Sequence, residues 1–491
     1  MMYEFKVSDI AEEFGVHRNT IRNWINAGTL PAQEGPGRKY MMKFEDYQVL
    51  CEKFGREPLI RPDSNVDLKT VSSLEAEKML GPVLELGKKT KTLYDDTQWA
   101  DECLTCGTCA SACPISGVDG LDPRKIVRMA FLGLEDDLIS SDWAWKCTMC
   151  AKCEDVCPAN IQIVHLMRRI RSKRERDKVP GPIHKGVMTC LERGNNIGIP
   201  KDDFLQLVEE LGEELAEESC PGFVTPVDIH GARIMVTINS REPFAEPDDM
   251  KWWWKIFHAA GESWTLTSEN WEGVNWGLFS GDDEAMRTVV GRIVDNMRRL
   301  NCEMLLLPEC GHAYYATRFG LNRWYPEALK EFKICTIFDL LLEYLDTGRI
   351  KVDNTIHTKR TVYHDPCNYG RKSMRAFGQA YYEEGRSITR ACCQDLVDME
   401  PNRGANYCCG AGGGAWAMPF ADERVYYGRM KARQVVESEA KLVIASCHNC
   451  RDQLKKSLNQ EYNLGVEVKY LWELVADSLV LPRNEINWTV G

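Results

Sequence analysis

A repeated cysteine run near the start of the chain constrains this sequence more than any other feature. The spacing C-x2-C-x2-C-x3-C-P occurs twice, at Cys103, Cys106, Cys109, Cys113 and again at Cys147, Cys150, Cys153, Cys157. Three thiolates on one tight loop can bind three corners of an iron–sulfur cube, and the fourth cysteine of each run reaches the other cluster. We therefore predict two [4Fe–4S] clusters, the first held by Cys103, Cys106, Cys109 and Cys157 and the second by Cys113, Cys147, Cys150 and Cys153.

Zinc is the alternative metal for such thiolates, since it also binds cysteine in sets of four. Two complete runs with trailing prolines favour iron–sulfur clusters. The 33 residues between the runs include the helical pattern 123–132. This module resembles the all-helical ferredoxin modules of fumarate reductase and heterodisulfide reductase more than a compact ferredoxin.

The bulk composition agrees with a redox protein of a reducing compartment. The 491 residues include 21 cysteines, yet the first residues carry no export signal, so metal chemistry is expected rather than disulfides. Apolar runs such as 304–308 are far too short to span a bilayer. The net charge of −12 does not suit non-specific nucleic-acid binding. We expect a cytoplasmic protein, attached peripherally to the membrane, if at all, through a partner subunit.

A second cysteine pattern lies in the C-terminal part. His364-Asp365-Pro366-Cys367 is followed after 40 residues by a Cys-Cys-Gly motif, and 37 residues separate the second cysteine of that motif from the first cysteine of Ser-Cys-His-Asn-Cys. These motifs resemble the cysteine-rich "CCG" domain of the heterodisulfide reductase family, with slightly longer gaps than usual. The resemblance implies a non-cubane iron–sulfur cluster that binds a substrate sulfur and cleaves disulfides, held by Cys367, Cys408, Cys409, Cys447 and Cys450.

Alternatives and accessory residues accompany this site. The five cysteines could also hold an ordinary [4Fe–4S] cluster with one spare thiol. We regard His448 and Cys310 as tentative catalytic residues, because imidazole can supply protons near neutral pH and Cys310 can line the site opposite the cluster. His364 and His312 are weaker candidates for the same role, and all three histidines could instead simply order their loops.

From about residue 230 the sequence alternates strand and helix patterns, which predicts an α/β domain. Strands are expected at 232–238, 303–307, 360–363 and 441–445, with helices at 287–300 and 421–439. The segments 301–310 and 440–447 resemble each other, since each is a strand that ends at a cysteine. We infer a duplicated half-domain whose first copy is degenerate, because it has Asn275-Trp276-Gly277 where a Cys-Cys pair is expected. This favours single-site relatives such as DsrK-like subunits.

The first 50 residues resemble the helix-turn-helix of MerR-type and excisionase-type modules. They contain six basic and seven acidic side chains, whereas a groove-reading module usually has a clear basic excess. Arg18, Asn19 and Arg22 fall on the expected recognition helix. We favour a protein-docking role over DNA binding.

The predicted fold is therefore a multidomain α plus α/β chain. We place a helix-turn-helix at 1–58, a helical two-cluster ferredoxin module with flanking helices at 59–185 and the duplicated cysteine-rich α/β domain at 186–491.

Two further segments have a distinctive composition. The helix at 161–178 has a basic face, suited to solvent, anionic lipid or an acidic partner. The tryptophans at 252–254 suit a core or a pocket.

The leading hypothesis is an iron–sulfur oxidoreductase subunit. Electrons from a cytochrome b-type quinol-oxidising membrane subunit or a flavoprotein would pass through the two [4Fe–4S] clusters and reduce a sulfur–sulfur bond of a small molecule or a partner protein. The alternatives are an electron relay without its own substrate and a redox-sensing DNA-binding regulator. No Rossmann or Walker motif is present, and we expect no flavin, NAD or haem on this chain.

Overall fold

The computed structural model describes residues 2–5, 7–14, 16, 18–34, 40–53, 103–308 and 310–481. The chain separates into two compact units, Met1–Leu84 and Glu85–Gly491. The sequence also predicts an amphipathic helix at 74–86, and both this segment and the predicted boundary at residue 58 lie outside the described residues. In the described part of the chain, no helix is both long and apolar enough to cross a membrane.

The N-terminal unit has the helix-turn-helix that its sequence predicts. Its elements are β1 (Met2–Phe5), α1 (Val7–Phe14), α2 (Arg18–Asn26), β2 (Ala32–Glu34), β3 (Tyr40–Lys43) and α3 (Phe44–Lys53). The strands form an antiparallel sheet in the order β1-β3-β2. Ile10, Phe14 and Ile21 are buried against Tyr47, and the rings of Phe14 and Tyr47 meet edge to face at 6.5 Å.

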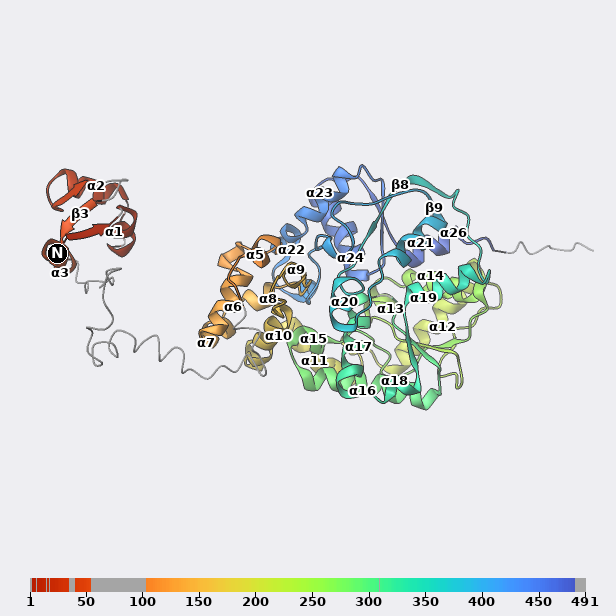
Figure 1. Cartoon of the computed structure of the whole chain (residues 1–491). Coiled ribbons are helices and arrows are strands. Elements are labelled where there is room, and N and C mark those ends of the chain that lie inside the picture. The colour runs from red at the N-terminus through yellow and green to blue at the C-terminus, as the bar shows by residue number, and fades with distance from the viewer. Residues whose placement is uncertain are drawn as a thin grey trace, which may run out of the picture. The chain divides into compact units, whose positions relative to one another are not determined.

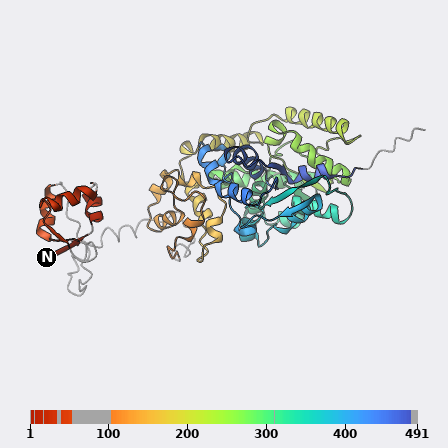
Figure 2. The same ribbon diagram turned by 90° about the horizontal axis from the view of Figure 1, so that it is seen from above.

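The cysteine-run module consists of helices alone over the described residues 103–193. These are α5 (Thr108–Ala112), 3₁₀-helix η3 (Val118–Gly120), α6 (Pro123–Phe131), α7 (Glu135–Ser140), α8 (Trp143–Lys146), α9 (Lys152–Asp155), α10 (Ile163–Lys173), 3₁₀-helix η4 (Arg176–Lys178) and α11 (Gly181–Arg193). Helix α6 begins where expected because the Asp122 carboxylate accepts hydrogen bonds from the first free amides and Pro123 needs none. Helices α5 to α8 gather at one end of the larger unit (Figures 1 and 2). The predicted boundary at residue 185 lies within α11.

The first half of the α/β region forms one parallel sheet with the order β5-β4-β6-β7. Its elements are α12 (Lys201–Glu218), β4 (Ile234–Val236), α13 (Arg241–Ala245), α14 (Asp248–Ala260), β5 (Trp264–Thr265), α15 (Trp276–Ser280), α16 (Asp283–Leu300), β6 (Met304–Leu306), α17 (Gly311–Trp324), α18 (Ala328–Glu331), β7 (Lys333–Cys335) and α19 (Ile337–Asp346).

The second half forms another parallel sheet with the order β11-β10-β8-β9. Its elements are β8 (His357–His364), α20 (Arg371–Phe377), α21 (Glu383–Cys392), β9 (Cys393–Val397), 3₁₀-helices η5 (Arg403–Ala405) and η6 (Ala415–Ala417), α22 (Ala421–Tyr427), α23 (Arg429–Glu437), β10 (Leu442–Ala445), α24 (His448–Asp452), π-helix η7 (Gln453–Leu458), α25 (Asn459–Glu461), β11 (Glu467–Tyr470) and α26 (Leu471–Ser478).

The two sheets share one topology. In chain order, the first strand of each half pairs with the second and the third, and the fourth adds beside the third. The third strand of each half leads into a cysteine that directly precedes a helix. Both cysteines have an extended backbone, with φ −146° and ψ 117° at Cys310 and φ −135° and ψ 126° at Cys447. This equivalence supports the predicted duplication, which stays a prediction. The predicted helix 421–439 is divided into α22 and α23 at Gly428.

One hydrophobic core joins both halves. Trp253 and Trp254 of α14 are fully buried in it, and the ring of Phe257 on the same helix lies 6.1 Å from Trp472 of α26. Among the interpretations of the tryptophan run, core packing is therefore correct for these two residues. Because α14 belongs to the first half and α26 to the second, burial of these rings holds the halves together and fixes the space between them.

Candidate metal centres

The first predicted ligand set lies close to the protein surface. Cys103, Cys106, Cys109 and Cys157 line one small cavity with Gly107 and Pro158. The sulfur of Cys106 is exposed and lies 3.2 Å from the Thr108 hydroxyl, and this hydrogen bond lowers the pKa of Cys106. Burial raises the pKa of Cys109 to about 11. The structure thus brings these four thiols together, as their spacing predicts.

The second set lies deeper. Burial raises the pKa of Cys153, and the neighbouring thiols Cys113, Cys150 and Cys147 add to this effect because they lie within electrostatic range. The backbone of the loop 147–150 is held by two buried arginines. Arg171 donates to the carbonyl of Cys147 at 2.8 Å, and Arg371 donates to that of Cys150 at 2.7 Å. The second set is therefore assembled inside the protein.

The five-cysteine site lies at the carboxyl edge of the second sheet, where loops after parallel strands meet. The sulfurs of Cys409 and Cys450 are 3.3 Å apart. Hydrogen bonds from Cys408 and Cys450 lower the pKa of Cys409, and hydrogen bonds from Cys310 and Cys450 lower that of Cys447. Burial raises the pKa of Cys367 to about 12, and Cys409 is among the thiols that contribute. All five predicted thiols and Cys310 are thus gathered at one place.

A tight junction connects the second set to the five-cysteine site. The Thr148 hydroxyl lies 3.5 Å from the sulfur of Cys408, and the thiols of Cys150 and Cys408 share a hydrogen bond. The glycines after the Cys-Cys-Gly motif explain how the chains approach so closely. A Cβ atom on Gly412 would lie 2.3 Å from the Thr148 carbonyl oxygen, and one on Gly413 would lie 2.5 Å from that of Cys147. Only glycine fits here.

His364 lies beside the five-cysteine site. Its position in the motif His364-Asp365-Pro366-Cys367 could have identified it as a stronger candidate for a catalytic residue. One of its ring nitrogens lies within 4.8 Å of the Cys409 and Cys450 sulfurs. Burial lowers the pKa of His364 to about 3, so the ring is neutral, and its Nδ1 has no hydrogen-bond partner among the described residues. A neutral imidazole with a free nitrogen suits either a donor to sulfur or a metal ligand.

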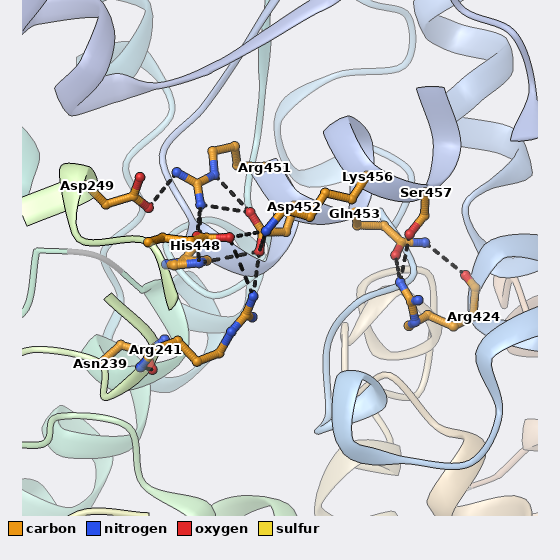
Figure 3. Close-up of polar contacts among 11 residues, drawn as sticks. Asn239, Arg241, Asp249, Arg424, His448, Arg451, Asp452, Gln453, Lys456 and Ser457 are labelled. Carbon is orange, nitrogen blue, oxygen red and sulfur yellow. Dashed lines mark hydrogen bonds and ion pairs between the residues drawn. The ribbon is translucent and has the colours of Figure 1, made fainter. Parts of the chain in front are cut away.

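The imidazole of His448 faces away from free solvent, into an ion network (Figure 3). Its Nε2 lies 2.9 Å from a Glu246 oxygen and 3.4 Å from an Asp452 oxygen. Burial lowers its pKa, but the hydrogen bonds to Asp452 and Glu246 outweigh burial and raise the pKa to about 9. In the same network Arg451 of α24 donates to Asp249 of α14 at 2.6 Å. The network therefore links the two halves directly behind Cys447 and Cys450.

His312 lies in a different environment. Its ring stacks on Phe279 at 3.9 Å and its Nε2 lies 3.2 Å from the carbonyl oxygen of Asn275. Burial lowers the pKa of His312 to about 3. These contacts describe a neutral ring that orders the loop where the first half has no Cys-Cys pair.

A pocket opens between the halves beside the five-cysteine site. Its cavity volume is about 230 Å³. Trp276, Phe279 and Cys310 line it from the first half, and Ala411 and Trp416 line it from the second. Trp276 is thus a pocket residue, unlike the buried pair on α14.

The basic helix predicted at 161–178 does not present all its charges to a solvent or lipid face. Arg171 is completely buried, and its guanidinium also donates to the carbonyls of Phe279 and Gly413 at 2.7 and 2.8 Å. The sequence pattern missed this role because an arginine on an amphipathic helix carries no local signal of the carbonyls that will receive it.

The donor sets fit iron–sulfur clusters. Thiols are the soft ligands that such clusters require, and each set is gathered on short loops whose amides and buried cations can balance the cluster's negative charge. The three sets lie in the order surface, interior and inter-half pocket. Such an order allows electrons to move between the surface and the pocket.

Comparisons with known proteins agree with these centres. Residues 99–161 match the family of 4Fe–4S dicluster domains, residues 361–455 the family of cysteine-rich domains, and residues 4–46 a helix-turn-helix domain. A probable membrane-anchored ferredoxin of Chromohalobacter salexigens is 26% identical over 40% of this chain and 28% of its own length.

Two further relatives cover more of their own length. The Hdr-like menaquinol oxidoreductase iron–sulfur subunit 2 of Archaeoglobus fulgidus is 24% identical over 59% of this chain and 58% of its own length. The D-type subunit of the dihydromethanophenazine:CoB–CoM heterodisulfide reductase of Methanosarcina barkeri is 25% identical over 41% and 47%. In each case the match spans less than two thirds of the relative.

Together, the two iron–sulfur domain matches and these relatives confirm the predicted resemblance: the chain is similar to the D-type subunit of heterodisulfide reductase and to Hdr-like iron–sulfur subunits, and it also carries a helix-turn-helix domain.

Proposed function

We propose that this chain is the iron–sulfur subunit of an Hdr-like redox complex and reduces a sulfur–sulfur bond at the five-cysteine site. The observation that carries the proposal is the junction between the second cysteine set and that site, where Thr148 lies 3.5 Å from Cys408. Electron transfer needs such proximity, whereas a merely structural metal site does not.

We assign Cys103, Cys106, Cys109 and Cys157 to the first [4Fe–4S] cluster and Cys113, Cys147, Cys150 and Cys153 to the second. Cys367, Cys408, Cys409, Cys447 and Cys450 would hold a third cluster of non-cubane type. That cluster, when bound, would supply single electrons so that RS–SR′ gains two electrons and two protons and leaves as two thiols. The pocket beside Cys310 offers room for the substrate.

We propose that electrons enter through the first cysteine set. Because Cys106 is exposed, the first set is the natural contact for an electron donor. We further propose that the donor is a cytochrome b-type quinol-oxidising membrane subunit or a flavoprotein, and that the chain works on the cytoplasmic side of the membrane. The substrate is a small-molecule disulfide or a cysteine pair of a partner protein.

The decisive experiment is low-temperature EPR of the anaerobically purified protein after oxidation in the presence of thiol, with iron and sulfide analysis. A paramagnetic oxidised species that is absent from Cys409→Ala supports the proposal. If only the signals of reduced cubane clusters appear, and reduced viologen does not drive disulfide cleavage, the chain is a relay without its own substrate.

The helix-turn-helix match favours a second function, redox-sensing DNA binding. Arg18, Asn19 and Arg22 are exposed on α2, the helix that would enter a groove. Selection of bound sequences from random DNA, followed by salt titration of Arg22→Ala, tests this function. Salt-sensitive specific binding lost in the variant would favour it, and absence of specific binding would leave the unit as a protein-docking module.

A further inference from the structure

Five buried basic side chains surround the second cysteine set and the five-cysteine site. Arg171 and Lys431 are 0% exposed, Arg371 is 3%, Lys372 is 5% and Arg424 is 8% exposed. Within the described part of the chain, none of them forms an ion pair with an aspartate or glutamate. Burying a charge without a partner of opposite charge is costly, so an anionic partner is expected.

Neutral groups hold these cations in place. Arg371 donates to the carbonyls of Cys150 and Asn406, both at 2.7 Å. The ammonium of Lys372 donates to the Asn368 side chain at 2.7 Å and lies 3.9 Å from the Tyr315 ring centre. The positions of the charges are thus fixed, while their charge stays uncompensated by these contacts.

Neutral side chains also hold Lys431 and Arg424. Lys431 donates to the Asn406 side chain, and Arg424 donates to that of Gln453 and stacks over the Trp416 ring at 3.7 Å. Asp365 is a carboxylate near Lys431, but Arg386 already binds both of its oxygens, at 2.6 and 2.9 Å.

Cysteine sulfurs lie near these cations, and they would carry the missing negative charge when they bind a cluster. Arg371 lies within electrostatic range of Cys150, Cys367 and Cys408, and these thiols raise its pKa although burial opposes this. Burial lowers the pKa of Lys431 to about 7 and lowers that of Arg424, but Cys409 lies within electrostatic range of both cations and opposes this, as Cys450 does for Lys431. Arg171 lies in range of Cys147. Arg171 therefore lies near the second cysteine set, Lys431 near the five-cysteine site, and Arg371 near both.

We infer that Arg171, Arg371, Lys372, Arg424 and Lys431 are positioning residues that set the reduction potentials of the clusters on these cysteines. The inference rests on the proposed clusters and not on the identity of the substrate. A cluster that gains an electron becomes more negative, and a fixed positive charge nearby favours that state. Removing the charge makes the cluster harder to reduce.

The division of the cations gives a selective test. Anaerobic redox titration with dithionite, followed by EPR, measures the potential of each cluster without any substrate. Lys431→Met should lower the potential of the third cluster only, Arg171→Met that of the second only, and Arg371→Met both. A tenfold decrease in the equilibrium constant for one-electron reduction, about 59 mV, is expected for each.

Two variants separate charge from structure. Arg171→Lys loses most of the carbonyl contacts but keeps the charge, so it should keep the potential and lose thermal stability. Lys251→Met removes another buried lysine, which is 8% exposed and pairs with Glu214 and Glu218, and should shift no potential. Iron content verifies that every titrated variant holds its clusters.

Unchanged potentials in the Met variants, or equal shifts of all clusters in Lys251→Met, would overturn the inference. A protein that assembles only the two cubane clusters would remove the proposed reductase function, but Arg171→Met would still have to shift the second cluster. The two proposals can therefore fail separately.

Discussion

The two halves of the α/β region share one strand order but differ in the buried charged groups that, among the described residues, have no ion-pair partner. At the carboxyl edge of the second sheet, cysteines lie among cations without carboxylate partners, such as Arg371 and Lys431. At the same edge of the first sheet, carboxylates are buried instead. Burial raises the pKa of Glu242 to about 8 and that of Glu272 to about 7.

The two halves neutralise their buried charged groups in different ways. In the first half, a buried carboxylate can become neutral by binding a proton, as the raised pKa of Glu272 indicates. In the second half, arginine cannot lose its proton near neutral pH, so the proposed cluster and its thiolates would supply the balance. Under this proposal, one half carries a metal site and the other half a protonated polar core.

The sharpest way to break this comparison is to remove one cysteine from each half. Cys450→Ser should abolish the third cluster, because Cys450 is a predicted ligand whose sulfur lies 3.3 Å from that of Cys409. Cys310→Ser should keep the cluster, since a serine can still donate to the Cys447 sulfur. Iron content and the oxidised-state EPR signal report both results. Equal loss of iron in the two variants would make Cys310 a ligand and contradict the contrast.

The cysteine sets and the α/β pattern could be predicted from sequence because their signals are local. Spacing brings Cys103, Cys106 and Cys109 onto one loop, and strands 303–307 and 441–445 appear as β6 and β10. The buried charges could not be predicted in this way. Arg451 pairs with Asp249, about two hundred positions away, and nothing near either residue indicates the other.

The same limit explains the role of the glycines after the Cys-Cys-Gly motif. A run of glycines indicates a loop in which the backbone can approach other groups closely. The structure adds that Gly412 and Gly413 accommodate the backbone of the loop 147–150, which belongs to another module. A close approach between segments so distant in the chain follows from tertiary packing and not from the motif.

The second test measures whether the buried carboxylate of Glu272, in the first half, is protonated in the folded protein. The folded pKa of Glu272, about 7, lies above its usual value of 4.5, so the folded protein binds this proton more tightly than the unfolded chain. The contribution of Glu272 to stability is therefore complete below pH 4.5 and is lost as pH rises to about 7. Its full size is about 3 kcal/mol.

Glu272→Gln should remove this part of the pH dependence, which unfolding by urea at pH 5 and pH 8 can measure. Glu269→Gln changes an exposed residue of the same loop, paired with Lys201, and serves as the control. An equal pH dependence of stability in the wild type and in Glu272→Gln would mean that Glu272 stays ionised in the folded protein. This result would contradict the idea that the first half neutralises its buried carboxylates with protons.

The smallest expected effect is that of replacing a tightly packed glycine in each half by alanine. A Cβ on Gly277, in the first half, would lie 2.5 Å from the Met286 amide, within that half, whereas one on Gly412 would strike the Thr148 carbonyl of the helical module. Gly412→Ala should cost about 1–3 kcal/mol through overpacking, and it should also slow electron transfer from the second to the third cluster. Gly277→Ala should destabilise without slowing that transfer, and Gly181→Ala, which has open space, should do neither. Thermal unfolding and rapid-freeze EPR after reduction separate the two effects. If Gly277→Ala slowed the transfer as much as Gly412→Ala, stability and not the junction would control the rate.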